Sequence, residues 1–289
     1  MRKPTSAVRQ VLNLIESDPK AAGQDRYIKP SSLAKGCMLY VAFELRGEPK
    51  PPLEGRIRRI LSVGSDSHRR LQRGLSRQCL GQEVFFEVPE YRIHGFCDAI
   101  LYLPGTPGKS GSFAGFWALE FKTTASRDFE VIRSADTPKE EHIRQAQIYL
   151  WGLETYYRHA IPLEGAIICY ENRDTLEHQA FEVLFDAEAM EDLLGRVKTL
   201  LADVEADRLS EDVLPPEHWA HQYCPYLQVC EPGQLAMAWQ AQQPKGLPDE
   251  VLADIIAKRI VAKKGAEKMT GKIGRTRSLA DLAQDLDWE

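Results

Sequence analysis

The sequence predicts an α/β fold in which a central mixed β-sheet is flanked by helices. Two observations lead to this prediction: short apolar segments bounded by turn residues indicate strands, and longer segments with apolar residues at helical spacing alternate with them. The chain has 289 residues, of which 43% are hydrophobic, and this is enough apolar material for a sizeable core. We therefore expect one large globular domain with appendages.

The first half of this domain is predicted to be a helix followed by a strand meander. Residues 56–75 carry apolar side chains at helical spacing, and His68 falls on the inward face of that helix. The period then changes, so we expect strands at residues 83–88, 92–103 and 116–123, with a glycine-rich turn before the third strand.

The second half is predicted to contain a crossover unit. We expect a helix at residues 139–158, strands at 165–170 and 177–185, and a long amphipathic helix at 187–207. The roughly forty residues between the third and fourth strands are enough for a helix that joins two parallel strands. The sheet is therefore expected to contain both antiparallel and parallel pairs.

The domain boundaries follow from changes in composition. We expect an N-terminal helical segment at residues 1–25 and the main domain at residues 26–240. The stretch AQQPKGLPDE (241–250) has the composition of a linker, and the remainder of 241–289 is predicted to be a helical tail that is first basic and then acidic.

Charge, hydropathy and cysteine content exclude several classes of protein. The formal net charge of −5 argues against a protein that coats nucleic acid along its whole surface, although it does not exclude a local basic groove. The sequence has no long apolar run of the kind that spans a membrane or directs secretion, so we expect a cytoplasmic protein without a membrane partner. Six scattered cysteines indicate free thiols or metal ligands rather than a disulfide framework.

Acidic residues interrupt two otherwise apolar strands. In WALEFKTTAS (117–126), Glu120 and Lys122 share one face of the predicted strand, and in HGFCDAILYL (94–103), Asp98 lies in an equally apolar segment. An unpaired carboxylate is costly to bury, so these acids need a partner. If the two strands pair, Asp98 and Glu120 converge, and two carboxylates bind a hard cation such as Mg²⁺.

This arrangement has a simpler alternative. Asp98 or Glu120 forms a cross-strand ion pair with Lys122 on a solvated face of the sheet, and no metal is involved. In the catalytic alternative, Lys122 neutralises a phosphate or orients an attacking water.

Five ordered motifs resemble the PD-(D/E)xK nuclease superfamily, in its RecB-like exonuclease branch, which includes CRISPR-associated and phage-encoded exonucleases. The five motifs are SSLAKGC (31–37), GSDSH (64–68), GFCDAI (95–100), LEFKTT (119–124) and QAQIY (145–149). With the late cysteines, the resemblance covers about residues 31 to 230. The resemblance implies a restriction-endonuclease-like core.

The resemblance also implies a set of site residues. His68, Asp98, Glu120 and the main-chain carbonyl of Phe121 would hold Mg²⁺ or Mn²⁺, and Asp98, Glu120 and Lys122 would be catalytic. A histidine on an apolar helix face is also compatible with a satisfied core residue, so this alternative stays open for His68.

Further residues are implied to support the site or to bind DNA. Gln145 and Tyr149, four residues apart on one helical face, would contact the DNA backbone or support Lys122, or else make a polar packing contact. Residues 56–77 contain seven arginines and one acid; such a run is either a solvated helix face or a phosphate track, and Arg69 and Arg73 are the candidates to guide a DNA strand.

A second metal site is implied by the late cysteines. Many RecB-like exonucleases hold a four-iron cluster with one early and three late cysteines, and Cys37, Cys224 and Cys230 fit that pattern. His221 stands at the first of the three late positions, which departs from the family. A Cys₃His set can still bind iron or zinc, or the cysteines simply pack without metal.

Together these inferences predict a divalent-metal-dependent DNA exonuclease that acts on single-stranded ends in replication, recombination or repair, with a helicase or recombinase as a possible partner. Two alternatives remain: an endonuclease of the same fold, and a DNA-binding recombination accessory module without turnover. Exonuclease preference comes from the resemblance alone.

Overall fold

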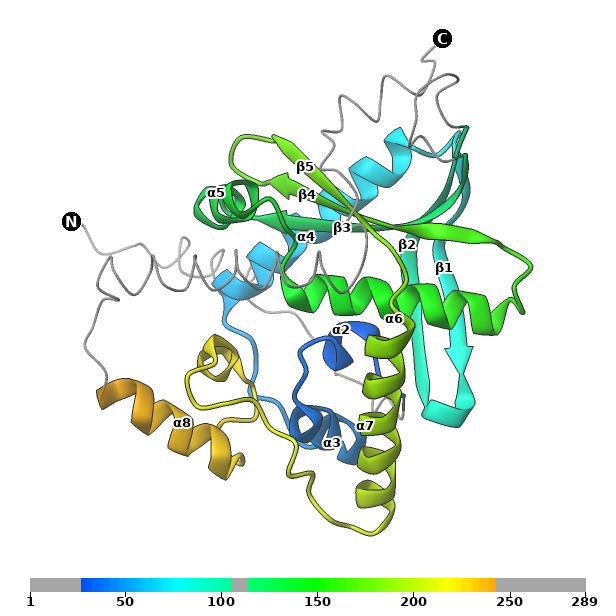
Figure 1. Cartoon of the computed structure of the whole chain (residues 1–289). Helices are drawn as coiled ribbons and strands as arrows, with labels where there is room; N and C mark the ends of the chain where they lie inside the picture. Colours follow the sequence, from blue (N-terminus) through cyan, green and yellow to red (C-terminus); the bar gives the residue numbers. More distant parts are fainter. Residues whose placement is uncertain (1–26, 105–113, 243–289) are drawn as a thin grey trace, which may run out of the picture.

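The computed structural model describes residues 27–104 and 114–242 of the chain (Figure 1). The expected N-terminal segment at 1–25 lies outside the described residues, and so does nearly all of the expected linker and tail at 241–289. None of the helices in the described residues is long and apolar enough to cross a membrane.

The predicted mixed sheet is confirmed. It has five strands in the order β1-β2-β3-β4-β5, in which β3 and β4 are parallel and the other neighbours are antiparallel. The strands are β1 (Cys79–Val88), β2 (Ile93–Leu103), β3 (Gly115–Thr124), β4 (Leu163–Asn172) and β5 (His178–Val183). The meander and the single parallel crossover are therefore those expected from the sequence.

The three long helices are also confirmed, within a few residues at each end. The helices are α2 (Pro30–Leu33), α3 (Met38–Arg46), α4 (Gly55–Gly74), α5 (Ser126–Ala135), α6 (Glu140–Tyr156), α7 (Ala187–Glu205) and α8 (Glu231–Gln242), with short 3₁₀ helices η1 (Pro89–Tyr91) and η2 (Trp219–Tyr223). The crossover also contains α5, a helix that was not predicted from the sequence. Helix α5 is short, and it buries only Phe129 and Ile132.

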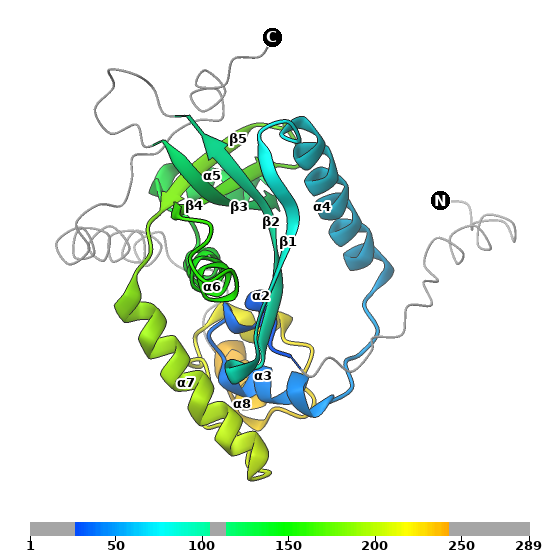
Figure 2. The ribbon, with the colours of Figure 1, turned by 90° about the vertical axis from the view of Figure 1, so that its right-hand side faces the viewer.

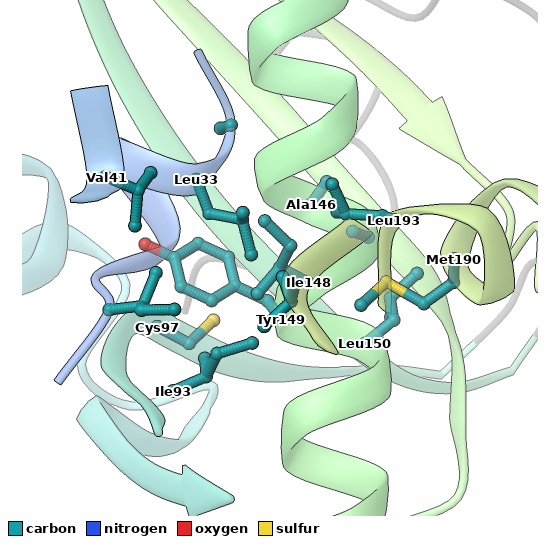
Figure 3. Packing of buried hydrophobic residues seen from close by; sticks show 14 of the residues in the cluster. Leu33, Val41, Ile93, Cys97, Ala146, Ile148, Tyr149, Leu150, Met190 and Leu193 are labelled. Atoms are coloured by element: carbon teal, nitrogen blue, oxygen red, sulfur yellow. The ribbon is translucent and has the colours of Figure 1, made fainter. Parts of the chain in front are cut away.

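The sheet has a different cover on each face. Figure 2 shows α4 on one side of the sheet and α6 and α7 on the other. The larger core lies between the sheet and α2, α3, α6 and α7, whereas a smaller core under α4 receives Leu71 and Leu75. Figure 3 shows the centre of the larger core, where Tyr149 of α6 lies among Leu33, Ile93 and Cys97.

Segments far apart in the sequence meet at the lower end of the molecule in Figure 1. The main-chain N–H groups of Met38 and Leu39 donate to the carbonyl of Asp212, and Arg196 of α7 binds both Asp212 and the carbonyl of Gly36. The start of α3 is therefore fixed against the segment that follows α7.

A close approach between α6 and β1 requires glycine at position 152. A Cβ atom added to Gly152 would lie 2.2 Å from Cε2 of the buried Phe86 ring, whereas a Cβ on Gly195 of α7 would meet nothing within 4 Å. We expect Gly152→Ala to lower the free energy of unfolding by about 1–3 kcal/mol because the core is overpacked. Gly195→Ala should instead raise it by about 0.5–1 kcal/mol, because alanine favours the helix.

Urea unfolding of the two variants beside the wild type measures both effects. Equal stability of the two alanine variants would contradict the described packing of α6 on β1.

Candidate active site

The candidate active site lies where β2 and β3 separate. The two strands pair from Leu103 with Gly115 up to Ala99 with Leu119, and the pairing ends there. At the next position Asp98 is 8% exposed, and its Oδ2 accepts the main-chain N–H of Phe121 at 2.7 Å. The carboxylate of Asp98 therefore takes the place of a main-chain carbonyl of β2 as the acceptor for the Phe121 N–H.

Glu120 projects from β3 toward α6, next to this gap. It is 3% exposed, and its Oε1 accepts hydrogen bonds from Lys122 Nζ at 2.5 Å and from Gln145 Nε2 at 3.0 Å. Its other oxygen, Oε2, is buried and has no hydrogen-bond partner. An unpartnered buried acceptor costs about 1–3 kcal/mol, so this oxygen is the atom of the site that a cation or a donor could satisfy.

The electrostatics of Glu120 reflect the same shortage of positive charge. Burial raises the pKa of the Glu120 carboxyl, Lys122 opposes this effect, and the nearby charge of Asp98 adds to it, so that the pKa is raised to about 7. A cation between the two carboxylates would remove their repulsion and satisfy Glu120 Oε2. The donor set thus fits a hard divalent ion.

His68 reaches the gap from the opposite side of the sheet. Its Nδ1 lies 3.5 Å from Asp98 Oδ1, and its ring packs edge-on against the Phe121 ring with centroids 5.8 Å apart. Burial lowers the pKa of His68, but the hydrogen bond and charge of Asp98 outweigh it, so that the pKa is raised. The side chain is 29% exposed, so the geometry differs from that of a core histidine.

Helix α6 supports Lys122 from the other side. Lys122 Nζ donates to Gln145 Oε1 at 2.9 Å, and Gln145 Nε2 donates to the hydroxyl of Tyr149 at 2.7 Å. Tyr149 is 6% exposed, which places it in the core rather than on a DNA-facing surface. The contacts of this pair are those expected of a support for Lys122.

The structure contains an ion pair at this site, but not the cross-strand pair on a solvated face that the simpler alternative describes. Lys122 does pair with a carboxylate, but the partner is Glu120 on the same strand, and the pair lies in a largely buried position rather than on a solvated face. Within the described residues, the side chain of Asp98 contacts His68 and the main chain of Phe121 rather than Lys122.

The two candidate DNA-contacting arginines lie on the outer face of α4. Arg69 pairs with Asp66 at 3.1 Å with both side chains mostly exposed, and Arg73 Nε donates to the carbonyl of Arg69. Neither contacts the Asp98–Glu120 group. They form a charged surface beside the site, not part of its interior.

The late cysteines are brought together with the early one. Cys37, His221, Cys224 and Cys230 all line one cavity of about 510 Å³ between α3, η2 and the start of α8. The Nε2 of His221 lies 3.2 and 3.0 Å from the carbonyl oxygens of Leu214 and Pro215, so Nε2 is the donor and Nδ1 is the nitrogen left for a metal. Such a bond fixes the tautomer in many metal-binding histidines.

Neither group is a finished metal site. Within residues 27–104 and 114–242, no three His, Cys, Asp or Glu side chains are arranged so that they could hold a metal ion as they stand. In the active site, the Glu120–Lys122 and His68–Asp98 contacts occupy the groups that would bind a cation.

Comparisons with known proteins give similarities of overall shape. No family model matches the chain, and no curated protein matches it. The solved structure of SSO0001 has a TM-score of 0.44 and 19% identity, covering 77% of this chain and 91% of that one.

An alkaline exonuclease (LHK-Exo) from Laribacter hongkongensis has a TM-score of 0.45 and 13% identity. The same exonuclease in complex with dAMP gives 0.46 and 12%, and both cover 64% of this chain and 90% of that one. At this level of similarity these structures assign no function to this chain.

The residues that hold the start of α6 against the sheet were not predicted from the sequence. The hydroxyl of Tyr170, on β4, accepts the main-chain N–H of Lys139 at 3.0 Å and lies 2.6 Å from His142 Nδ1. Because burial lowers the pKa of His142, its imidazole is neutral in the folded protein, and Nδ1 can accept the hydrogen of the Tyr170 hydroxyl. In the sequence, the only local indication of this contact was His142 itself, three residues before Gln145.

This arrangement predicts an acid-sensitive contribution to stability. Burial, with the charges of Lys122 and Lys139, lowers the pKa of His142 to about 2. Below about pH 6.5 the unfolded chain therefore takes up a proton that the folded chain does not, and stability falls as the pH falls. His142→Gln keeps an acceptor for Tyr170 without titrating, so its loss of stability should be smaller by up to about 1.4 kcal/mol per pH unit.

Urea unfolding of the wild type and His142→Gln between pH 5 and pH 8 tests this prediction. The other acids titrate equally in both proteins, so the difference isolates His142. Parallel stability profiles over that range would contradict it.

Proposed function

We propose that this chain is a divalent-metal-dependent deoxyribonuclease that hydrolyses phosphodiester bonds from the ends of single-stranded DNA. The single observation that carries the proposal is the buried Glu120 Oε2, which has no partner although it lies beside Asp98 and Lys122. A protein that only binds DNA gains nothing from burying two acids at a strand gap with one carboxylate oxygen left unpartnered, because that burial is costly.

The proposed ion is Mg²⁺ or Mn²⁺, held by Asp98, Glu120, His68 and the carbonyl oxygen of Phe121. When bound, the ion would supply a Lewis acid that activates water and stabilises charge on the phosphate. Asp98 is already fixed by the N–H of Phe121, so one of its oxygens stays oriented toward β3 while the other faces His68.

The remaining groups have distinct roles in the proposal. Lys122 holds an ammonium group between Glu120 and Gln145, from which it can neutralise a phosphate oxygen or orient a water. Gln145 and Tyr149 keep that ammonium in place. No side chain acts as a covalent nucleophile, because a water attacks the phosphorus.

The preference for single-stranded ends is supported by the family resemblance, and the exposed Arg69 and Arg73 would guide the strand electrostatically. The same resemblance suggests a role in DNA replication, recombination or repair, with a helicase or recombinase as partner.

Removal of the acid or the amine should abolish cutting. We expect Asp98→Asn and Lys122→Ala each to slow DNA cleavage by on the order of 10²–10³-fold, because each removes a group that stabilises the transition state. DNA binding should be retained. Asp207→Asn and Lys198→Ala serve as matched controls, because those side chains are 95% and 63% exposed.

The assay uses end-labelled linear and closed circular single-stranded DNA with Mg²⁺ or Mn²⁺. Loss of the linear form alone supports the exonuclease, cutting of circles indicates an endonuclease, and DNA binding without cutting indicates an accessory module. Undiminished cleavage by Asp98→Asn would remove the assignment.

We also propose that Cys37, His221, Cys224 and Cys230 hold a four-iron cluster, with zinc as the alternative. Support comes from the shared cavity and from the two carbonyl oxygens that hold His221 through Nε2, which leaves Nδ1 as its possible metal ligand. A cluster here would join α3 to the region of η2, which closes a very long loop and restricts the unfolded chain.

Anaerobic purification tests this cluster. We expect a brown protein with a broad visible absorption band, and loss of both in Cys224→Ser, because a thiolate ligand is removed. Cys79→Ser, outside the cavity, is the control. A colourless preparation without iron contradicts the cluster, and metal analysis then separates zinc from no metal.

A further inference from the structure

Helix α4 is held on the sheet mainly by polar contacts. Of its twenty residues only Ser67 and Gln72 are buried, and both are polar. Gln72 Nε2 donates to the carbonyl of Asp98 at 3.0 Å and to Glu83 Oε1 at 2.7 Å. Because hydrogen bonds are directional, these contacts fix the position of α4 more narrowly than apolar packing alone.

The strongest of these contacts are made to Glu171, which lies on β4 next to Tyr170. Glu171 is 2% exposed, and it accepts hydrogen bonds from the Ser67 hydroxyl and from Arg70. The third group on it is His178 of β5, whose Nε2 lies 2.9 Å from Glu171 Oε2. A fully buried carboxylate thus ties two residues of α4 to two neighbouring strands.

The place of this contact in α4 connects it to the active site. Ser67 and Arg70 flank His68 in the sequence, and His68 is the residue through which α4 reaches Asp98. In the parallel β3–β4 ladder, Glu171 is level with Thr123, one residue beyond Lys122. Glu171 therefore links the helix that carries His68 to the strand beside the one that carries Glu120 and Lys122.

We infer that Glu171 is a positioning residue for His68, which it holds at the strand gap through Ser67 and Arg70. This inference rests on the proposed function, because the purpose of the position is to place the imidazole beside the metal site. Groups that orient metal ligands typically contribute about 10- to 100-fold to metal affinity or activity.

The experiment measures Mn²⁺ affinity by calorimetry, together with DNA cleavage, for Glu171→Gln, His68→Ala and the double variant. Glu171→Gln keeps the size of the side chain and removes its charge. Glu177→Gln is the matched control, since Glu177 lies in the same β4–β5 hairpin with its side chain 55% exposed. Thermal unfolding confirms that each variant is folded.

We expect Glu171→Gln to weaken Mn²⁺ binding about tenfold, and the double variant to bind no more weakly than His68→Ala. Unchanged Mn²⁺ affinity in folded Glu171→Gln overturns the inference. A double variant whose fold-loss of Mn²⁺ affinity equals the product of the two single losses also overturns it, because Glu171 then acts independently of His68. A purely structural role would lower the unfolding temperature without this coupling.

A second variant and the wild-type measurement distinguish failure of this inference from failure of the proposed function. If Glu171→Gln does not fold, Ser67→Ala removes only one bond to Glu171 and should weaken Mn²⁺ binding in the same direction by a smaller factor; no change overturns the inference. A wild type that binds Mn²⁺ through Asp98 while Glu171→Gln binds it equally well overturns only this inference. A wild type that binds no Mn²⁺ overturns the proposed function as well.

Discussion

The end of pairing between β2 and β3 is the constraint on which the candidate site depends. Up to Ala99 and Leu119 the two strands satisfy each other, and two residues beyond Leu119 the N–H of Phe121 must find another acceptor. Asp98 supplies it with a carboxylate oxygen. A buried acid is therefore part of the backbone hydrogen bonding here, and its second oxygen is left at an opening that other side chains can reach.

Both sides of the sheet contribute to this opening through consecutive residues of β4. Because side chains alternate along a strand, Tyr170 and Glu171 face opposite sides. Tyr170 holds the start of α6 through His142 and Lys139, and Glu171 holds α4 through its polar contacts. One short piece of strand thus fixes the helix that carries Gln145 and the helix that carries His68.

The polar network at the site is satisfied except at one atom. Lys122 and Gln145 bond to each other and to one oxygen of Glu120, and Gln145 also donates to the hydroxyl of Tyr149. The second oxygen of Glu120 stays unpartnered. Proteins rarely leave buried acceptors without partners unless a ligand, ion or function accounts for them. The pKa of Glu120, raised by burial to about 7, shows the same shortage of partners, because the buried carboxylate is harder to ionise.

The sequence by itself determined the strands, the long helices and the presence of acids in apolar strands, because these follow from periodicities of two and 3.6 residues. It also indicated Asp98, Glu120 and Lys122, since charge in an apolar strand is visible in a local window. Only the tertiary structure decided which arginine of α4 points inward, that Tyr149 is buried, and that Glu171 and Tyr170 brace two helices. Those contacts join residues up to about a hundred positions apart. No pattern within a short window of sequence shows which of such distant residues will meet, because that depends on how the whole chain closes.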